Sequence, residues 1–208
     1  VYMCCTNSIG VADLFEIIER YAATQSKVEA VYVWFDLLCA DQHSGAADAP
    51  LPMLWWQTTF RTTLKAIGST CIALHPWDSS EVLKTSVTHM QLHLAIVLSD
   101  KSLSPIAKKE KDKKEKGNEE KDKEKHTISV SVTAAEAARL DAAMRDDMEA
   151  PMKVLDTRVD GWRKGVEAPT EAQRASIDKA IEKAGPNGES GGYEDFGRKL
   201  ADILHTWL

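Results

Sequence analysis

The stretch Ala30–Leu38, AVYVWFDLL, decides the fold that this sequence predicts. It is a nearly continuous run of β-branched and aromatic residues, and only Asp36 interrupts it. Such a run is typical of a strand that is covered on both faces, as the strands of parallel sheets are. Two shorter apolar runs, Val1–Cys5 and Ser69–Leu74, stand before and after it. We therefore expect one parallel sheet, in which Val31–Phe35 is flanked on both faces.

Segments with helical periodicity separate these strands. After the first strand, apolar residues recur three or four positions apart, at Leu14, Ile17, Ile18 and Tyr21. Before the third strand, a second helix is expected to carry Phe60, Leu64 and Ile67 on its core face and to end at Gly68. Strands joined by helices of about a dozen residues imply right-handed βαβ crossovers. The predicted fold class is therefore α/β, with a parallel sheet flanked by helices.

The middle of the chain is less regular. Within Glu81–Pro105, either a helix continues through Leu98 or Leu94–Leu98 (LAIVL) is a fourth strand. The run Lys108–Lys125 holds nine Lys and seven Asp or Glu, and it contains no large apolar residue. Such a segment has nothing to bury, so we expect a solvated surface insertion, with an interaction tail as the alternative. The expected parts are a core over residues 1–106, an insertion over 107–126, and a last strand with C-terminal helices over 127–208.

The last part predicts one strand followed by helices. The alternation in Thr127–Val132 (TISVSV) fits a strand with one solvated face. Thr133 and Glu136 have the spacing of a capping box, which opens a long helix that Pro151 is expected to kink. The apolar stripe of this helix is rich in methionine, and we interpret it as core rather than as a docking groove. Further helices are expected over Thr170–Ala184 and Gly191–Leu208.

Composition excludes several classes of protein. The chain has 208 residues, with 26 Lys or Arg against 32 Asp or Glu and a formal charge of −6, so no basic footprint for nucleic acid or an anionic membrane is present. No apolar run reaches the roughly 18 residues that a membrane helix needs. The four cysteines form no CxxC pair, so we expect reduced thiols in a cytoplasmic protein, without disulfides or a zinc site. No cofactor is predicted.

The sheet also indicates where a ligand would bind. Ligands of open parallel sheets lie outside the carboxyl ends of the strands, which here are followed by the loops Thr6–Gly10, Cys39–Ser44 and His75–Ser80. The candidate residues at this crevice are Asn7, Ser8, Gly10, Asp36, Gln42, His43, Trp77 and Asp78. No phosphate loop, nucleophile elbow or zinc-protease motif accompanies them. Asp36 either lies at the lip of the crevice or belongs to a buried polar network.

Two stretches carry a resemblance to a known family. The stretches VYVWFDLLCADQH and WWQTTFRTTLKAIGSTCIALHPWD resemble a TIR-like domain of algal and protist multidomain proteins, which often accompanies tetratricopeptide arrays of kinesin-light-chain or nephrocystin type. The resemblance continues weakly through TAAEAARLDAAM to the closing LHTWL. It implies a flavodoxin-like sheet, and it matches Asp36, Gln42, His43, Trp77 and Asp78 to family positions by their place in the chain.

The chain departs from that family in two places. The first strand ends in Cys4-Cys5-Thr6-Asn7, where the family has a Ser-His-Ala-Trp-like sequence. The helix after Pro-Trp usually carries Thr-Arg-X-Trp-Cys-Leu-Trp-Glu, whose Glu resembles the carboxylate with which TIR enzymes cleave NAD. Here Leu83–Leu92 contains His89 and Gln91 but no Trp, Cys or Glu. Because cleavage develops positive charge on the sugar, neither side chain replaces a carboxylate.

We therefore predict a non-catalytic TIR-like module for protein–protein association, a pseudoenzyme whose partners are proteins, a second copy of the chain included. The alternatives are an NAD glycohydrolase or related nucleotide hydrolase that uses Glu81, and an architectural subunit of a large complex. The direction in which Glu81 and Asp36 point distinguishes the first alternative, because an enzyme would hold both carboxylates across one crevice.

Overall fold

The computed structural model describes residues 1–6, 8–27, 31–35, 55–84, 86–99, 126–165, 175, 179 and 192–208. Its elements in chain order are β1 (Tyr2–Cys4), α1 (Val11–Ala23), a π-helical turn η2 (Trp56–Phe60), α4 (Arg61–Ile67), β2 (Ser69–Ala73), a 3-10 turn η3 (Glu81–Leu83), α5 (Ser86–Ser99), β3 (Thr127–Ser131), α7 (Ala134–Asp146), α8 (Ala150–Gly165) and α10 (Gly192–Trp207).

The three strands form one parallel sheet in the order β1-β2-β3. Tyr2 pairs with Thr70, and Ser69 pairs with Thr127. The parallel sheet predicted from the strand–helix alternation is therefore confirmed for the first and third runs, and β3 extends it. Strands β2 and β3 consist of β-branched and small residues, and β1 of the apolar residues Tyr2, Met3 and Cys4, all of which fit a pleated, buried surface.

Residues Val31–Phe35, the apolar run from which the parallel sheet was predicted, lie beside β1 on the side opposite β2. The Met3 N–H donates to the Trp34 carbonyl at 2.8 Å, and the Trp34 N–H donates to the Val1 carbonyl at 2.9 Å. This pairing is parallel, but it amounts to a single bridge between Tyr2 and Trp34 rather than a full strand. In space the sequence segments therefore follow one another as 31–35, β1, β2 and β3.

The expectation that Val31–Phe35 is covered on both faces is only partly correct. The Trp34 ring lies 5.2 Å from that of Tyr2, and Phe35 is buried on the opposite face in the cluster that faces α1. Tyr32, however, is 83% exposed. Periodicity showed that the segment is apolar, but burial of each side chain depends on whether a helix reaches that end of the strand.

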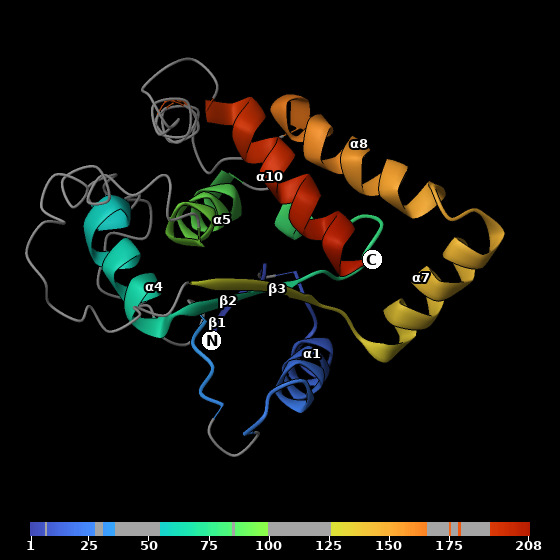
Figure 1. The fold of residues 1–208 in the computed structure, drawn as a ribbon, viewed down its shortest axis with the longest axis horizontal. Helices are drawn as coiled ribbons and strands as arrows, with labels where there is room; N and C mark the ends of the chain where they lie inside the picture. Colours follow the sequence, from blue (N-terminus) through green and yellow to red (C-terminus); the bar gives the residue numbers. More distant parts are fainter. Residues whose placement is uncertain are drawn as a thin grey trace, which may run out of the picture.

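Helices cover the two faces of the sheet unequally (Figure 1). Helix α1 lies on one face, and α5, α8 and α10 lie on the other. Because side chains alternate along a strand, Met3 and Cys5 of the β1 region face α1, whereas Tyr2 and Cys4 enter the larger core on the opposite face. Three cysteines, Cys4, Cys5 and Cys71, are buried, as expected for small apolar residues, while Cys39 lies outside the described residues.

Helix α5 resolves the alternative left open for residues 81–105. The sequence LAIVL belongs to a helix that ends at Ser99, and no strand forms from it. Met90, Leu92 and Ala95 are all buried, and so are the polar residues between them. A helix that is buried nearly all round lacks the amphipathic pattern by which surface helices are recognised, which is why the sequence was ambiguous here.

The long helix predicted after Thr133 is two helices. Helix α7 ends at Asp146, and α8 begins at Ala150, one residue before Pro151, so the proline stands in the first turn where its missing N–H costs nothing. The interpretation of the methionine stripe as core is wrong at its centre, because Met148 lies in this break and is 75% exposed. The stripe returns to the core at Leu155 and Val159.

Gly68 ends α4 as predicted, with a left-handed φ of 81° and its N–H donating to the Leu64 carbonyl at 3.0 Å. We expect Gly68→Ala to lower the free energy of unfolding by about 1 kcal/mol, because a side chain strains this conformation. Urea denaturation of both proteins measures the difference. A Cβ at this position meets no heavy atom within 4 Å, so a much larger loss would contradict the conformational explanation.

Candidate functional site

The loops at the carboxyl ends of β1 and β2, with the first turns of α1 and α7, form the site that the fold singles out; we call it the carboxyl edge. After β1, the Thr6 and Ser8 hydroxyls lie 2.8 Å apart, and Ser8 and Gly10 are exposed. Gly10 precedes α1 without a side-chain cap. Two candidates from the sequence, Ser8 and Gly10, therefore stand at the edge with open access.

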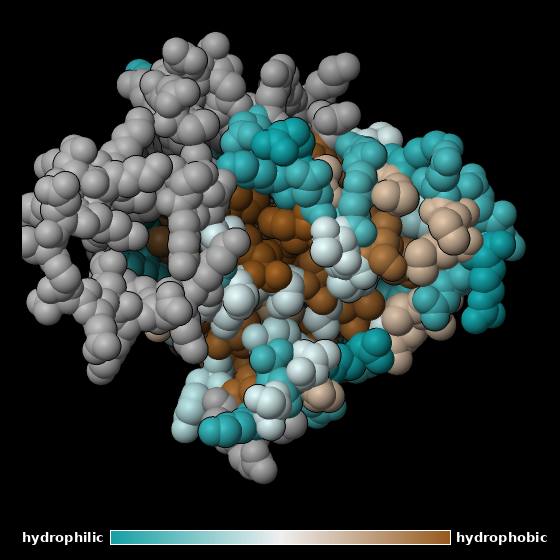
Figure 2. Space-filling view, viewed as in Figure 1, coloured by the Kyte–Doolittle hydropathy of each residue, from teal (hydrophilic) through white to brown (hydrophobic). Residues whose placement is uncertain are grey.

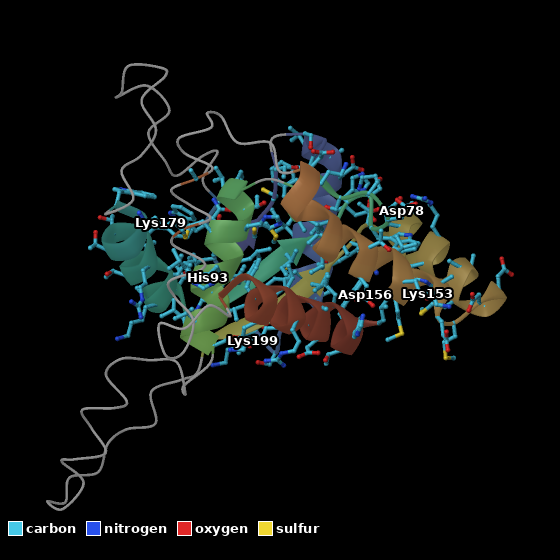
Figure 3. All side chains as sticks on the ribbon, turned by 90° about the horizontal axis from the view of Figure 1, so that it is seen from above. Asp78, His93, Lys153, Asp156, Lys179 and Lys199 are labelled. Carbon is cyan, nitrogen blue, oxygen red and sulfur yellow. The ribbon has the colours of Figure 1, made fainter. Side chains whose placement is uncertain are left out.

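The loop after β2 is held in place by α7. The Trp77 N–H donates to Glu136 Oε2 at 2.9 Å, and Arg139 donates from its two terminal nitrogens to Glu136 Oε1 and to Asp78 Oδ2, both at 2.7 Å. Glu136 is 6% exposed and Trp77 is 5% exposed. Figure 3 shows Asp78 beside α7. Both loop candidates are therefore engaged in a hydrogen-bond network with α7, Trp77 in its buried part and Asp78 at its partly exposed end.

The capping box explains how Glu136 reaches that loop. The Thr133 hydroxyl accepts the Glu136 N–H at 3.3 Å, as the spacing predicted. The Glu136 carboxylate reaches the backbone of the loop after β2 in addition, and the adjacent guanidinium neutralises its charge. The hydrogen bond and charge of Glu136 raise the pKa of Arg139 above its ordinary value, with Asp78 adding to the effect.

A second set of contacts ties α1 to the same edge. Glu16 Oε1 accepts the N–H of Ala134 at 2.6 Å, so a side chain from α1 caps the start of α7. Asp13, in the first turn of α1, has its Oδ2 atom 3.7 Å from Nε2 of His75. A Cβ atom added to Gly10 would lie 2.7 Å from Oδ2 of Asp13, so the carboxylate packs directly against this glycine. The edge therefore carries four carboxylates, Asp13, Glu16, Asp78 and Glu136.

His89 and Gln91, which stand in the stretch where the TIR-like resemblance would lead one to expect an acid, lie in the core instead of at the edge. Gln91 is 1% exposed, and its Oε1 atom accepts a hydrogen bond from the thiol of Cys4 at 3.6 Å, on the face of the sheet that α5 covers. His89 is also 1% exposed, and burial lowers its pKa to about 4. Gln91 therefore faces β1, His89 packs against Phe196 of α10, and neither side chain is accessible to a substrate outside the strand ends.

The other sequence candidates lie outside the described residues. They are Asn7, Asp36, Gln42 and His43. Sequence reasoning missed Asp13, Glu16, His75 and Arg139. Their signals were present in part, since Asp13 and Glu16 follow the first loop on one helix and Arg139 stands three positions after Glu136. What the sequence did not contain was the proximity of α1 to α7.

The chemistry available at the edge is limited. In the part of the chain that the structure describes, no group of three His, Cys, Asp or Glu side chains is arranged to hold a metal ion. The Glu81 carboxylate in η3 accepts a hydrogen bond from the ammonium of Lys84, the residue after this turn, at 2.6 Å, so it is already paired. No protein-family model, curated protein or solved structure was found to match this chain at a significant level.

Proposed function

We propose that the chain is a non-catalytic, TIR-like interaction module of a larger signalling or structural assembly. The observation that carries the proposal is the position of Gln91. In the TIR-like resemblance a carboxylate follows the third strand of the chain and faces the crevice, whereas this chain has a neutral amide there, 1% exposed and bonded to Cys4. A residue without charge or access offers no stabilisation to a cationic transition state.

The order of the strands supports a flavodoxin-like sheet. Numbered as they occur in the chain, the segments 31–35, β1, β2 and β3 follow one another in space as 2-1-3-4. This is the order of the doubly wound flavodoxin-like sheet, in which the crevice opens between the first and third strands. The loops of β1 and β2 would then flank that crevice, which is where Ser8, Trp77 and Asp78 stand.

The network around Trp77 supports association over catalysis. A loop that binds a substrate usually leaves polar groups accessible to it. Here the backbone N–H of Trp77 and the Asp78 carboxylate are bonded within the chain, and the polar side-chain atoms of the loop that lack a partner, His75 Nδ1, Trp77 Nε1 and Ser80 Oγ, are buried. The rigid edge is suited to presenting a fixed surface. Its exposed portion, Ser8 and Gly10, accommodates at most a weakly bound nucleotide, and binding alone would not contradict the proposal.

An NAD glycohydrolase remains the second candidate. The observation in its favour is Glu81, a carboxylate that is only half-buried and follows the loop after β2. Its partner in that reading, Asp36, lies outside the described residues, so the relative direction of the two carboxylates stays open. An architectural subunit is the third candidate, which shares the expectation of protein partners in the cytoplasm.

None of the described helices is long and apolar enough to span a membrane.

The protein is expected to release no nicotinamide from NAD above a buffer control. Losing one partner for the transition-state charge typically removes a factor of about 10² to 10³ in rate, and here the surrounding aromatic residues are missing too. Incubation with NAD followed by chromatographic detection of nicotinamide measures this, with an active NAD-cleaving enzyme as the positive control. Release that Glu81→Ala abolishes and Gln91→Ala does not would replace the proposal by the enzyme reading.

A further inference from the structure

Strand β3 is an open edge of the sheet. All three residues of β1 and four of the five residues of β2 are buried, whereas Thr127 of β3 is exposed and its other residues are half-buried. Strand β2 lies on one side of β3, and no other strand of the described chain lies on the other side. A doubly wound sheet commonly continues past its fourth strand, so this edge is a place where pairing stops early.

The main-chain groups that face the open side belong to two residues. The Thr127 N–H donates to the Gly68 carbonyl, and the Ser131 carbonyl accepts from the Leu74 N–H, both at 3.0 Å. In a parallel ladder alternate residues bond to the same neighbour, so Thr127, Ser129 and Ser131 face β2. The N–H and C=O groups of Ile128 and Val130 therefore point away from the sheet.

The surroundings of this edge are apolar and lack the usual protection. Edge strands are normally protected by Lys, Pro or a bulge, but Thr127–Ser131 (TISVS) contains no charge and no proline. The side chains of Ile128 and Val130 are half-buried against the larger core, as are Ile203 and Trp207 of α10, which packs over β3. Figure 2 shows hydrophobic residues gathered on this side of the molecule between hydrophilic helices.

We infer that β3 is a dimerisation edge, at which two copies of the chain pair antiparallel about a two-fold axis through Ser129. This register follows from the outward groups. With Ser129 opposite its own copy, Ile128 meets Val130 of the other chain, and each pair exchanges both main-chain hydrogen bonds, which makes four in all. The β-branched side chains of Ile128 and Val130 then lie opposite each other on the α10 face, which is a favourable cross-strand pair.

Charge favours a second copy over a charged partner. Helix α10 stands above β3 and would meet its symmetry mate along the same axis. The ion pairs along this helix join Asp195, Arg198, Lys199 and Asp202, two acids and two bases, at 2.7 to 3.3 Å. Two such surfaces approach without net repulsion, and neither offers an excess of charge to a strongly basic or acidic peptide. The inference does not depend on the proposed function.

The test is a disulfide at the two-fold axis. Directly opposite residues of a non-hydrogen-bonded antiparallel pair have Cα atoms about 4.5 Å apart, within the roughly 4.4 to 6.8 Å that a disulfide spans. Cys71 pairs with Ser129 in the ladder and would compete for a new thiol there, so the background carries both Cys39→Ser and Cys71→Ser. In this background we expect Ser129→Cys to give a covalent dimer as the main product under mild oxidation. Non-reducing electrophoresis and mass spectrometry measure the product, and reduction should return the monomer.

The matched control is Thr127→Cys, an exposed position on the same face of the same strand. In the inferred register Thr127 lies opposite Ser131 of the other chain, and the two copies of residue 127 are about 13 Å apart along the strand, too far for a disulfide. We expect this variant to stay monomeric under the same oxidation. Equal cross-linking of both variants, or of neither, would overturn the register and with it the inference.

A third variant tests the dimer without cysteine chemistry. Val130→Pro removes an N–H that faces the open side, so the ladder to β2 keeps its hydrogen bonds while two of the four bonds across the axis are lost. Sedimentation equilibrium is expected to show concentration-dependent dimers for the parent chain and monomers for the variant, with circular dichroism confirming that the variant is folded. A parent chain that is monomeric up to millimolar concentration, or a folded Val130→Pro variant that dimerises as well as the parent, would contradict the inference.

Discussion

Acidification from pH 7 to pH 5 is expected to lower the free energy of unfolding by about 4 kcal/mol through two buried histidines. His89 and His93 stand one turn apart on α5, and both rings pack edge-on against Phe196 of α10, with centroids 5.9 and 5.8 Å away. Burial lowers the pKa of each from 6.5 to about 4, because a charged imidazolium loses its hydration in this core.

The groups around each imidazole ring add to or oppose the lowering of its pKa by burial. His93 lies between Lys199 of α10 and Arg61 of α4, which lower its pKa further, while Asp195 acts the other way. Figure 3 labels His93 on α5 and Lys199 on the neighbouring helix α10. For His89, the backbone of Leu83 partly offsets burial by hydrogen bonding. Both histidines are therefore neutral in the folded chain near pH 7.

Stability decreases on acidification because the unfolded chain binds more protons than the folded chain in this pH range. In the unfolded chain both histidines take up protons as the pH falls through 6.5, whereas in the folded chain they do so only near pH 4. The stability is complete above about pH 7 and is lost progressively between pH 6.5 and 4. At pH 5 the loss is of order 2 kcal/mol for each histidine, since one pKa unit corresponds to about 1.4 kcal/mol.

Replacing each ring separates this effect from general acid denaturation. His89→Leu and His93→Leu each keep an apolar group against Phe196, and we expect each to remove about half of the decrease between pH 7 and 5. Urea denaturation at several pH values measures the slopes. A double variant with the parental pH dependence would show that other groups carry the acid sensitivity, and proton uptake measured on unfolding at pH 5 provides an independent check.

Glu136→Ala is expected to destabilise the chain by about 3 kcal/mol. The substitution leaves the buried Trp77 N–H without its acceptor at 2.9 Å, and a buried donor deprived of its partner costs about 1 to 3 kcal/mol, more where the partner was charged. It also removes the carboxylate that joins Arg139 to the network. Thermal and urea unfolding at pH 7 measure the loss.

Two further variants separate the contributions. Glu136→Gln retains an oxygen that accepts the Trp77 N–H, so we expect it to recover most of the stability. Arg139→Ala removes the link to Asp78 at the surface, where ion pairs contribute little, so its effect should be much smaller than that of Glu136→Ala. A loss for Glu136→Gln as large as that for Glu136→Ala would mean that the charge, and not the hydrogen bond to the loop, holds the edge together.

Sequence patterns recovered the elements whose signals are local. Short apolar runs predicted β1 and β2, Gly68 predicted the end of α4, and the spacing of Thr133 and Glu136 predicted the start of α7. Each of these signals depends on residues within a few positions of one another. The prediction was ambiguous for α5, because a helix that is buried nearly all round lacks the alternation of polar and apolar faces from which helical periodicity is recognised.

The candidate site was predicted less well than the fold. The rule that ligands lie at strand ends led to Trp77 and Asp78, and the structure places both at the carboxyl edge. It did not predict that they are bonded to α7, and four of the candidates lie outside the described residues. Whether a polar residue at a strand end is available depends on what packs against it, which no spacing within the loop reveals.

By itself the sequence determined the α/β class, the parallel pairing of its first and third runs, and the burial of Cys4, Cys5 and Cys71. All three properties depend on which face of an element is apolar, and this can be recognised from residues within one helical turn or a few strand positions. Tertiary structure alone decided that Glu136 accepts the backbone N–H of Trp77, 59 residues away, and that no strand of the described residues pairs with the outer side of β3. Such outcomes arise when the elements dock, because only then do distant donors, carboxylates and strand edges compete for the same partners.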